Sequence, residues 1–538
     1  MKPNQKFYLA TCLSLIMTIV PAMAFSQTEA LPTETSMLFS GSGNCAFCHT
    51  SNGVALTDSK GIDLSISTDW RATMMGNSAR DPLWQAKVES EVMENPALKA
   101  LIEDKCTTCH APMGRTQAVH DGASGYSIEA MRTNALAMDG VSCTACHQIQ
   151  PENLGTDASF SGKYQIEDTR QIFGPYQDVV PMPMMHHTGY TPQYGEHIHK
   201  SELCATCHTL FTPFVDDEGE IAGMFPEQTP YLEWQNSIFS QKEIHCQDCH
   251  MPRIDEAVKI SSMPPWIGTQ SPFWRHQFVG GNAFMLQIIR DNAAEIGATA
   301  TAAQFDKTIA QTRMQLREKT ASLNVQPSRK GGQLLLEVEI ANRTGHKFPT
   351  GFPGRRAWLH VLVQNDNGEK IFESGAFDQN GRIQNLTSIF EPHYDFISSE
   401  NQAQIYETVM TDVNDELTFT LLRAAKYKKD NRLPPRGFVS TAKRIADVAI
   451  HGAAAGDANF NRDDKNEGTG RDLVTYQIAV PATTKNLKFM VELLYQTAKP
   501  AFVDDLLMHD TPAVARFSKY FHGASKAPEV IAHMAGAL

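Results

Sequence analysis

The residues that most directly suggest chemistry are five copies of the pattern Cys-x-x-Cys-His. The chain has 11 cysteines, and ten of them form these five pairs. The copies are Cys45/Cys48/His49, Cys106/Cys109/His110, Cys143/Cys146/His147, Cys204/Cys207/His208 and Cys246/Cys249/His250. Two thiols three residues apart can reach the two vinyl groups of one porphyrin, and the adjacent histidine then lies under the iron as its proximal ligand. The pattern predicts five covalently attached haem c groups.

Three other uses of paired cysteines fit the pattern less well. Zinc ribbons contain C-x-x-C pairs, but they do not require a histidine after every pair. Thioredoxin-like redox pairs occur once per domain rather than in a series of five. A disulfide scaffold does not explain the constant spacing within each pair. Haem attachment therefore accounts best for all five copies.

The N-terminus has the features of a secretory signal peptide, expected at residues 1–24. Lys2 and Lys6 form a basic segment, residues 7–20 form an apolar segment, and Ala22-Met23-Ala24 offers a cleavage site. Cleavage after Ser26, an uncleaved anchor and lipidation at Cys12 are alternatives that fit less well. No later segment is apolar for long enough to span a membrane. We expect an exported protein, periplasmic or extracellular at the cell surface, with no stable membrane insertion after cleavage.

The charge of the chain narrows the range of partners. The 538 residues carry a formal charge of -13. Loss of residues 1–24 removes Lys2 and Lys6 but no acid, leaving 45 basic against 60 acidic residues, a balance of -15. Such a surface argues against nucleic acid, which is bound mainly by basic side chains. The expected partners are other redox proteins or terminal electron acceptors.

The hydrophobic pattern divides the chain into an α+β multidomain protein. Residues 40–282 form a loop- and helix-rich pentahaem domain, because they hold all five motifs and show little strand pattern. Residues 283–327 show helical periodicity, including Met314, and are expected to be a connector. Residues 328–500 alternate as strands do and predict an immunoglobulin-like β-sandwich. Residues 501–538 are expected to form a helical tail, with two short helices between 512 and 538.

Several elements can be placed within these domains. Helices are expected from Asp81-Pro82 through Val92 and from Pro96 to Cys106, because proline suits the first helical position. Strands are expected at 334–340, 357–364, 416–422, 473–480 and 487–494. Asp457, Asn459, Asn461 and Asp463 alternate like a calcium loop, but the rest of an EF-hand is missing. A solvated turn is the expectation there.

Five segments resemble a group within the multihaem cytochrome c superfamily that has a cytochrome c-554-like haem arrangement. They are residues 201–208 (SELCATCH), 225–230 (FPEQTP), 246–252 (CQDCHMP), 275–282 (RHQFVGGN) and 344–351 (TGHKFPTG). The resemblance covers roughly residues 40–365. It implies closely packed haem pairs with mostly two histidines per iron, in proteins exported by anaerobically respiring bacteria. It does not imply one substrate, since the superfamily includes carriers and reductases.

The second, distal ligand of each iron must come from elsewhere in the chain. Fourteen histidines remain after the five proximal ones. His276 and His346 are favoured, because each lies near glycines that let the backbone approach a porphyrin face, and because both match the motifs of the resembling proteins. His187 and His197 come next, with His186 and His199 as near-equivalents. His120 follows the second motif at a distance that allows local ligation.

Other side chains have simpler explanations. Met74 and Met75 could ligate one iron, although helix packing is the favoured role. His360, His393 and the histidines beyond them are expected to be structural or surface residues. Trp70, Trp84, Trp234 and Trp274 are expected to pack against porphyrin edges.

Two functions fit a chain of five haems. The first is an electron carrier in anaerobic respiration, and the second is a reductase of a small nitrogen or sulfur oxyanion with one open iron. The carrier is favoured because candidate distal histidines outnumber the irons. In addition, no C-x-x-C-K motif is present, whereas the pentahaem nitrite reductases use a lysine-ligated active haem. We therefore expect no catalytic residues.

Overall fold

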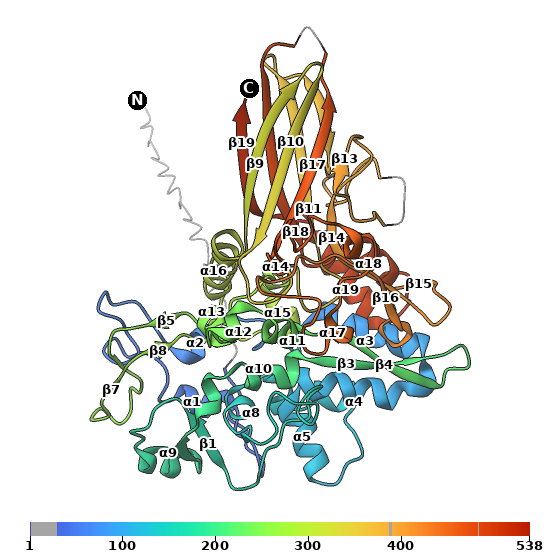
Figure 1. The fold of residues 1–538 in the computed structure, drawn as a ribbon. Coiled ribbons are helices and arrows are strands. Elements are labelled where there is room, and N and C mark those ends of the chain that lie inside the picture. Colours follow the sequence, from blue (N-terminus) through green and yellow to red (C-terminus); the bar gives the residue numbers. More distant parts are fainter. Residues whose placement is uncertain (2–29, 387–389, 482–483) are drawn as a thin grey trace.

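The computed structural model describes residues 1, 30–386, 390–481 and 484–538. The expected signal peptide therefore lies outside the described residues except for Met1. Figure 1 shows two parts, a lower part of short helices and loops and an upright set of long strands. We call residues 30–282 the N-terminal region and residues 321–538 the β region. The mixture of helices and sheets confirms the predicted α+β class.

The N-terminal region is built from short elements. Its helices are α1 (Ser42–Ala46), α2 (Ile66–Arg71), α3 (Pro82–Glu94), α4 (Lys99–His110), α5 (Pro112–His120), α6 (Ile128–Arg132), α7 (Ala135–Met138), α8 (Cys143–Cys146), α9 (Pro181–Thr188), α10 (Ser201–His208), α11 (Pro230–Gln235), α12 (Ile238–Gln241) and α13 (Cys246–His250), with 3-10 turns η1 (Pro96–Leu98) and η2 (Glu196–His199). Four two-stranded pairs join them: β1 (Gln171–Gly174) with β2 (Thr191–Tyr194), β3 (Leu210–Val215) with β4 (Ile221–Gln228), β5 (Arg253–Ile254) with β8 (Phe273–Trp274), and β6 (Val258–Lys259) with β7 (Thr269–Gln270).

The two helices predicted in this region are present. Helix α3 starts at Pro82, and the Asp81 side chain accepts hydrogen bonds from the backbone N–H groups of Leu83 and Trp84. These bonds satisfy donors that the first turn leaves free. The segment from Pro96 begins as η1 and continues as α4, which ends at His110 and so carries the second motif.

Most of the expected connector is helical, in α14 (Ala283–Asp291), α15 (Ala293–Ile296) and α16 (Ala302–Lys319). The buried side chains Leu286 and Ile289 of α14 pack with Phe305 and Ile309 of α16. Met314 is exposed, so its assignment to the apolar stripe was wrong.

The β region contains two sheets. One has the strand order β13 (Phe396–Ile397), β17 (Arg471–Ala479), β10 (Gln333–Asn342), β9 (Ala321–Lys330). The other has the order β15 (Leu417–Thr418), β14 (Ile405–Thr411), β11 (Arg356–Asn365), β18 (Leu487–Gln496), β19 (Glu529–Ala537), with β12 (Lys370–Ser374) on β11 and β16 (Lys426–Asp430) on β14. Short helical elements complete it: η3 (Leu421–Arg423), α17 (Ile445–Val448), η4 (Ala453–Gly456), α18 (Pro500–Leu506) and α19 (Pro512–Gly523).

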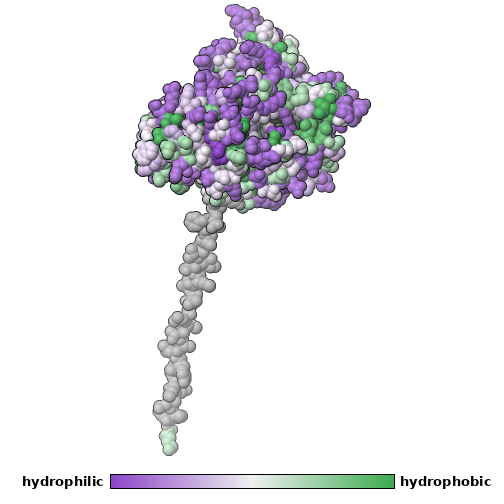
Figure 2. Space-filling view, turned by 90° about the horizontal axis from the view of Figure 1, so that it is seen from below, coloured by the Kyte–Doolittle hydropathy of each residue, from purple (hydrophilic) through white to green (hydrophobic). Residues whose placement is uncertain are grey.

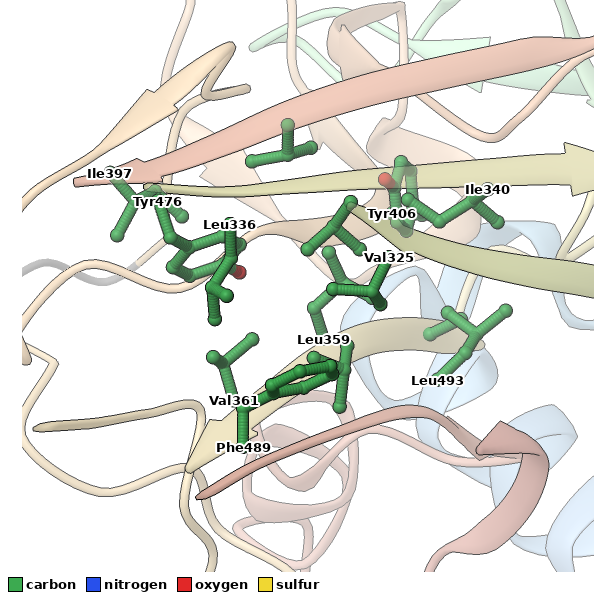
Figure 3. Packing of buried hydrophobic residues seen from close by; sticks show 14 of the residues in the cluster. Val325, Leu336, Ile340, Leu359, Val361, Ile397, Tyr406, Tyr476, Phe489 and Leu493 are labelled. Atoms are coloured by element: carbon green, nitrogen blue, oxygen red, sulfur yellow. The ribbon is translucent and has the colours of Figure 1, made fainter. Parts of the chain in front are cut away.

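Side chains from both sheets share one hydrophobic core (Figure 3). Leu336 of β10 and Tyr476 of β17 come from the first sheet, and Val361 of β11 and Phe489 of β18 come from the second. Alternate residues of β10 and β17 are buried, because successive side chains of a strand point to opposite faces. This alternation made β10, β17 and β18 predictable.

Three predictions for the β region were wrong. Residues 529–537 form strand β19 rather than a helix, because they pair antiparallel with β18 along almost their whole length. Such pairing overrides local propensity. The strand expected at 416–422 is reduced to β15 followed by η3. Strand β9 begins at Ala321, inside the expected connector.

The segment of alternating Asp and Asn residues is only partly a solvated turn, because Asn459 and Asp463 are exposed but the other two residues are buried. Asp457 is buried and accepts a hydrogen bond from His393 Nε2 at 3.0 Å. Asn461 is also buried and donates to the Phe438 carbonyl oxygen at 2.8 Å. These bonds hold the segment against the β-region core.

The lower face of the molecule is largely hydrophilic, with scattered hydrophobic patches (Figure 2). Among the residues that the structure describes, no helix is both long enough and apolar enough to cross a membrane.

Candidate haem site

All five cysteine motifs line one continuous cavity of about 1530 Å³. Every one of their ten cysteines and five histidines contributes to its wall. Trp70, Trp84, Trp234 and Trp274 also line it, as the sequence suggested. Protein interiors are otherwise close-packed, so a space of this size, surrounded by thiols and imidazoles, fits large apolar groups bound through those residues.

Short helices present the two thiols of each motif. Motifs two, three, four and five lie on or at the ends of α4, α8, α10 and α13, and the first motif begins in α1. Residues three apart lie on the same face of a helix, and the fourth residue along lies beside them. Each helical turn therefore directs two thiols and one imidazole to the same side.

Four of the five motif histidines are anchored through Nδ1. His49 Nδ1 lies 2.9 Å from the Ile260 carbonyl oxygen, His110 Nδ1 3.2 Å from that of Ser78, and His147 Nδ1 2.7 Å from that of Phe173. His250 Nδ1 is bonded in the same way to Val279. A carbonyl can only accept, so Nδ1 carries the proton and Nε2 is left free for a metal.

Burial keeps these imidazoles neutral, which a metal ligand must be. It lowers the pKa of His110 to about 4. The pKa of His208 is also lowered to about 4, by burial first and then by His250 and Arg355.

Two further histidines face motif histidines across a gap of defined width. The ring centroids of His147 and His276 are 6.2 Å apart, with planes 22° from parallel. Those of His250 and His346 are also 6.2 Å apart, with planes 19° from parallel. Two imidazoles that bind one metal from opposite sides, with bonds of about 2 Å, have centroids about 6 Å apart. Each pair therefore has the spacing that one iron atom between the rings requires.

The free nitrogens of His276 and His346 are oriented in the same way. His276 Nδ1 lies 3.2 Å from the Trp274 carbonyl oxygen, and His346 Nδ1 lies 2.9 Å from that of Lys347. In each case Nε2 remains available. Burial lowers the pKa of His276 to about 3 and that of His346 to about 4, so both rings are neutral.

Each of these two histidines is next to a buried cation that is fixed by a carboxylate. Arg275 Nε lies 2.7 Å from Asp69 Oδ2, and Lys347 Nζ lies 2.6 Å from Asp430 Oδ2. The four side chains are nearly inaccessible to solvent. A buried ion pair with good geometry fixes the backbone around it, and here that backbone carries the histidine.

The loop that carries His346 belongs to the β region but reaches into the N-terminal region. Glu233 of α11 is fully buried and accepts from Lys347 N at 3.0 Å and from Thr350 Oγ1 at 2.5 Å. It also forms an ion pair with Arg432 at 3.1 Å. Gly345 packs so closely that an added Cβ would lie 3.0 Å from Trp234 Cδ1.

The structure does not support the expected distal roles of His120 and His197. His120 ends α5, lies outside the cavity wall, and has Nδ1 3.1 Å from the exposed carboxylate of Asp121. His197 Nε2 lies 2.9 Å from the Ile149 carbonyl oxygen. That bond occupies the nitrogen that would bind an iron.

The cavity wall contains only one histidine from each pair of alternative distal ligands that the sequence left open. His187 and His199 line it, whereas His186 and His197 do not. The His187 ring stacks on that of Phe47, with ring centroids 4.7 Å apart, and the ring centroids of His199 and Trp274 are 4.1 Å apart.

Met74, Met75, His245 and Arg355 are also part of the wall. His245 and Arg355 were not singled out from the sequence, although His245 immediately precedes the fifth motif and Arg355 follows the segment 344–351.

Thiols of different motifs contact one another. Cys45 lies close enough to Cys143, Cys109 to Cys207, and Cys204 to Cys246 for each thiol to shift the pKa of the other. Cys143, together with burial, raises the pKa of Cys45. Neighbouring motifs are therefore within side-chain contact, which is the arrangement that close packing of haems requires.

A second cluster, in the β region, brings together His393, Asp457 and Asp472. Gln404 Nε2 and Asn431 Nδ2 both approach His393 Nδ1, at 2.8 and 3.1 Å. Their amide oxygens accept from backbone N–H groups, which fixes the orientation of both amides. His393 therefore accepts at Nδ1 and carries its proton on Nε2, toward Asp457. This tautomer suits a buried hydrogen-bond network rather than a metal ligand.

Comparison with known proteins gives a structural relative. No protein-family model matches the sequence, and no curated protein sequence matches it either. The structure is similar to the crystal structure of a penta-heme cytochrome c552 from Thermochromatium tepidum, with a TM-score of 0.52 and 17% sequence identity. The similarity covers 88% of this chain and 96% of that one. The chain therefore shares its fold with a multihaem cytochrome c.

Proposed function

We propose that this protein is a c-type cytochrome that carries electrons through five covalently bound haems. The single observation that carries the proposal is the cavity whose wall contains all five Cys-x-x-Cys-His motifs. The fold shared with a penta-heme cytochrome supports it. Haem iron supplies one-electron transfer. The ten motif cysteines would form the thioether bonds, and His49, His110, His147, His208 and His250 would be the proximal ligands.

The distal ligands follow from the same cavity. We assign His276 opposite His147 and His346 opposite His250, because both pairs have the required 6.2 Å spacing. His187 and His199 are the remaining histidine candidates in the wall that the sequence also named. Two firmly held imidazoles on one iron change little when the iron gains or loses an electron, which suits a carrier.

The location and partners are proposed from the sequence. A cleaved signal peptide at residues 1–24 would export the protein to the periplasm or to the cell surface. The partners would be other redox proteins or terminal electron acceptors in anaerobic respiration. The excess of acidic residues favours basic docking surfaces on those partners.

A reductase of a small nitrogen or sulfur oxyanion is the second candidate. One observation favours it. Among the described residues, no histidine ring faces His49, His110 or His208 at the distance found for the two assigned pairs. An iron without a second protein ligand could bind a small molecule.

The proposal is tested by haem content and by the axial ligands. The protein, produced with a c-type maturation system, should carry five covalent haems by intact mass spectrometry. His276→Ala and His346→Ala should each keep five haems but gain a high-spin ferric signal and carbon monoxide binding. His360→Ala is the matched control, because His360 lies between Glu373 and Glu492, away from the cavity. Four or fewer haems in the wild type would contradict the proposal, and unchanged spectra would remove the two ligand assignments.

A further inference from the structure

One guanidinium in the cavity wall lacks a carboxylate partner among the described residues. Arg355 donates from Nη1 to the Thr350 carbonyl oxygen at 2.7 Å. Its Nε is buried and has no hydrogen-bond partner in the described part of the chain. Arginine has five N–H donors, so most of the donor capacity of Arg355 is unused by the protein.

Two buried guanidinium groups of this protein are neutralised by carboxylates, whereas a third, that of Arg356, donates to Gln496 Oε1 and to the Gly381 carbonyl oxygen, both at 2.9 Å. Arg275 pairs with Asp69 at 2.7 Å, and Arg432 pairs with Asp430 at 2.7 Å. A guanidinium N–H that is enclosed by protein and has no partner is unfavourable unless an acceptor or a counter-charge approaches it. The cavity that Arg355 lines should therefore supply an anion when it is filled.

Arg355 is held by the loop that carries His346, because the Thr350 carbonyl oxygen that accepts from Arg355 Nη1 belongs to the segment 344–351. After burial and His250, the Arg355 guanidinium is the next cause that lowers the pKa of His208. It also lowers the pKa of His346, behind burial and His250. The fourth and fifth motifs are adjacent, since Cys246 N donates at 3.2 Å to Ser201 Oγ, on the helix that carries the fourth motif. Arg355 lines the cavity together with His208, His250 and His346, which with its bond to the His346 loop puts it beside the fourth and fifth motif sites.

We propose that Arg355 binds an anionic oxygen group, a carboxylate or a small oxyanion, at the junction of the His208 and His250–His346 sites. The planar fork of arginine matches two oxygens held at carboxylate spacing. The group has two sources, a propionate of one of the two neighbouring haems or a soluble oxyanion that enters the pocket beside His208. The inference rests on the proposed function, because the propionate source and the reacting iron both require bound haem.

The test uses the haem-loaded full chain and three variants. Arg355→Gln removes the charge, and Arg355→Lys keeps it but loses the fork. Arg343→Gln is the matched control, because Arg343 lines the same cavity but is exposed. Mass spectrometry first establishes five haems in each protein. Loss of haem from the wild type itself would count against the proposed function, not against the role of Arg355.

Two measurements separate the sources. If a propionate is bound, Arg355→Gln lowers the reduction potential of one or two haems, because the lost positive charge had favoured the reduced iron. Arg355→Lys then gives a smaller shift, and nitrite leaves every ferric spectrum unchanged. If a soluble oxyanion is bound, nitrite perturbs the wild-type ferric spectrum with saturation. Arg355→Gln then weakens that binding about tenfold or more, as expected for a charge-assisted hydrogen bond.

The inference is overturned if the potentials and the nitrite response of Arg355→Gln equal those of the wild type. It is also overturned if Arg343→Gln produces shifts as large as those of Arg355→Gln. In that case the effect would belong to net charge near the cavity rather than to a bound anion.

Discussion

The N-terminal region and the β region bury their apolar side chains in different ways. The β region has one continuous core, in which both sheets contribute alternate residues of long strands. The N-terminal region has several small clusters, such as the one around Phe39 and Met113, arranged about a large cavity. Hydrophobic burial is the main favourable term in folding. One region thus obtains it from its own side chains, and in the proposed function the other is completed by the bound haems.

The contrast between the two regions is tested most strongly in protein that is produced without haems. In protein produced without c-type maturation, protease should cleave throughout residues 40–282 while a fragment containing β9 to β18 persists. The reason is that only the β region has a continuous protein core. Limited proteolysis with mass spectrometry measures this, and the haem-loaded protein is the control. Equal resistance of both regions would contradict the contrast.

The connection between the regions is tested at Glu233. Glu233→Gln leaves Arg432 with one carboxylate instead of two and weakens the bonds to the loop that carries His346. Breaking a buried ion pair costs about 3–5 kcal/mol, which denaturant unfolding would detect. Glu295→Gln is the control, because Glu295 pairs with Lys519 at an exposed position and its loss should leave the stability nearly unchanged. Similar losses in both variants would argue against Glu233 as a structural link.

The smallest expected effect is the loss of folding stability at low pH that is caused by one carboxylate of the β region. Burial alone would raise the pKa of Glu407, but Lys499, Lys429 and Arg356 lower it to about 2. Against an unfolded value of about 4.3, this difference contributes up to about 3 kcal/mol. The contribution is fully present above pH 4.3 and is lost as the pH falls toward 2.

Glu407→Gln should therefore be less stable than the wild type at pH 7, and its stability should fall less between pH 4.3 and 2. Chemical unfolding followed across this range gives both results. Glu339→Gln, which removes an exposed pair with Arg471, should keep the wild-type pH profile. If the free energy of unfolding of Glu407→Gln depends on pH as that of the wild type does, another carboxylate causes the loss of stability in acid.

Local patterns predicted the parts of the fold that depend on local physics. Asp81 followed by Pro82 marked the start of α3, and the alternation of residues 334–340 marked β10. The segment 529–537 has no such pattern, because its strand exists only through pairing with β18. The motif cysteines could be found from spacing alone, since thioether attachment is a local requirement.

The positions opposite the motif histidines could be predicted only in part. His276 and His346 were marked by nearby glycines and by resemblance, and the structure places both beside a motif histidine. His197 and His199 differ by two residues on the turn η2, and only the path of the chain decides which one lines the cavity. His120 ends α5 at an exposed position and does not line the cavity. Such choices depend on contacts between residues far apart in sequence.

The anchoring of His49 has a consequence for the order of assembly. Its acceptor, the Ile260 carbonyl oxygen, is 211 positions further along the chain. With the proposed export from the N-terminus, the first motif would emerge long before that acceptor, and residue 346 would follow later still. The early motifs would then meet the attachment machinery before their anchors exist. Final docking of the first imidazole would await residue 260, beyond the last motif, so assembly of these sites would be late and cooperative rather than one motif at a time.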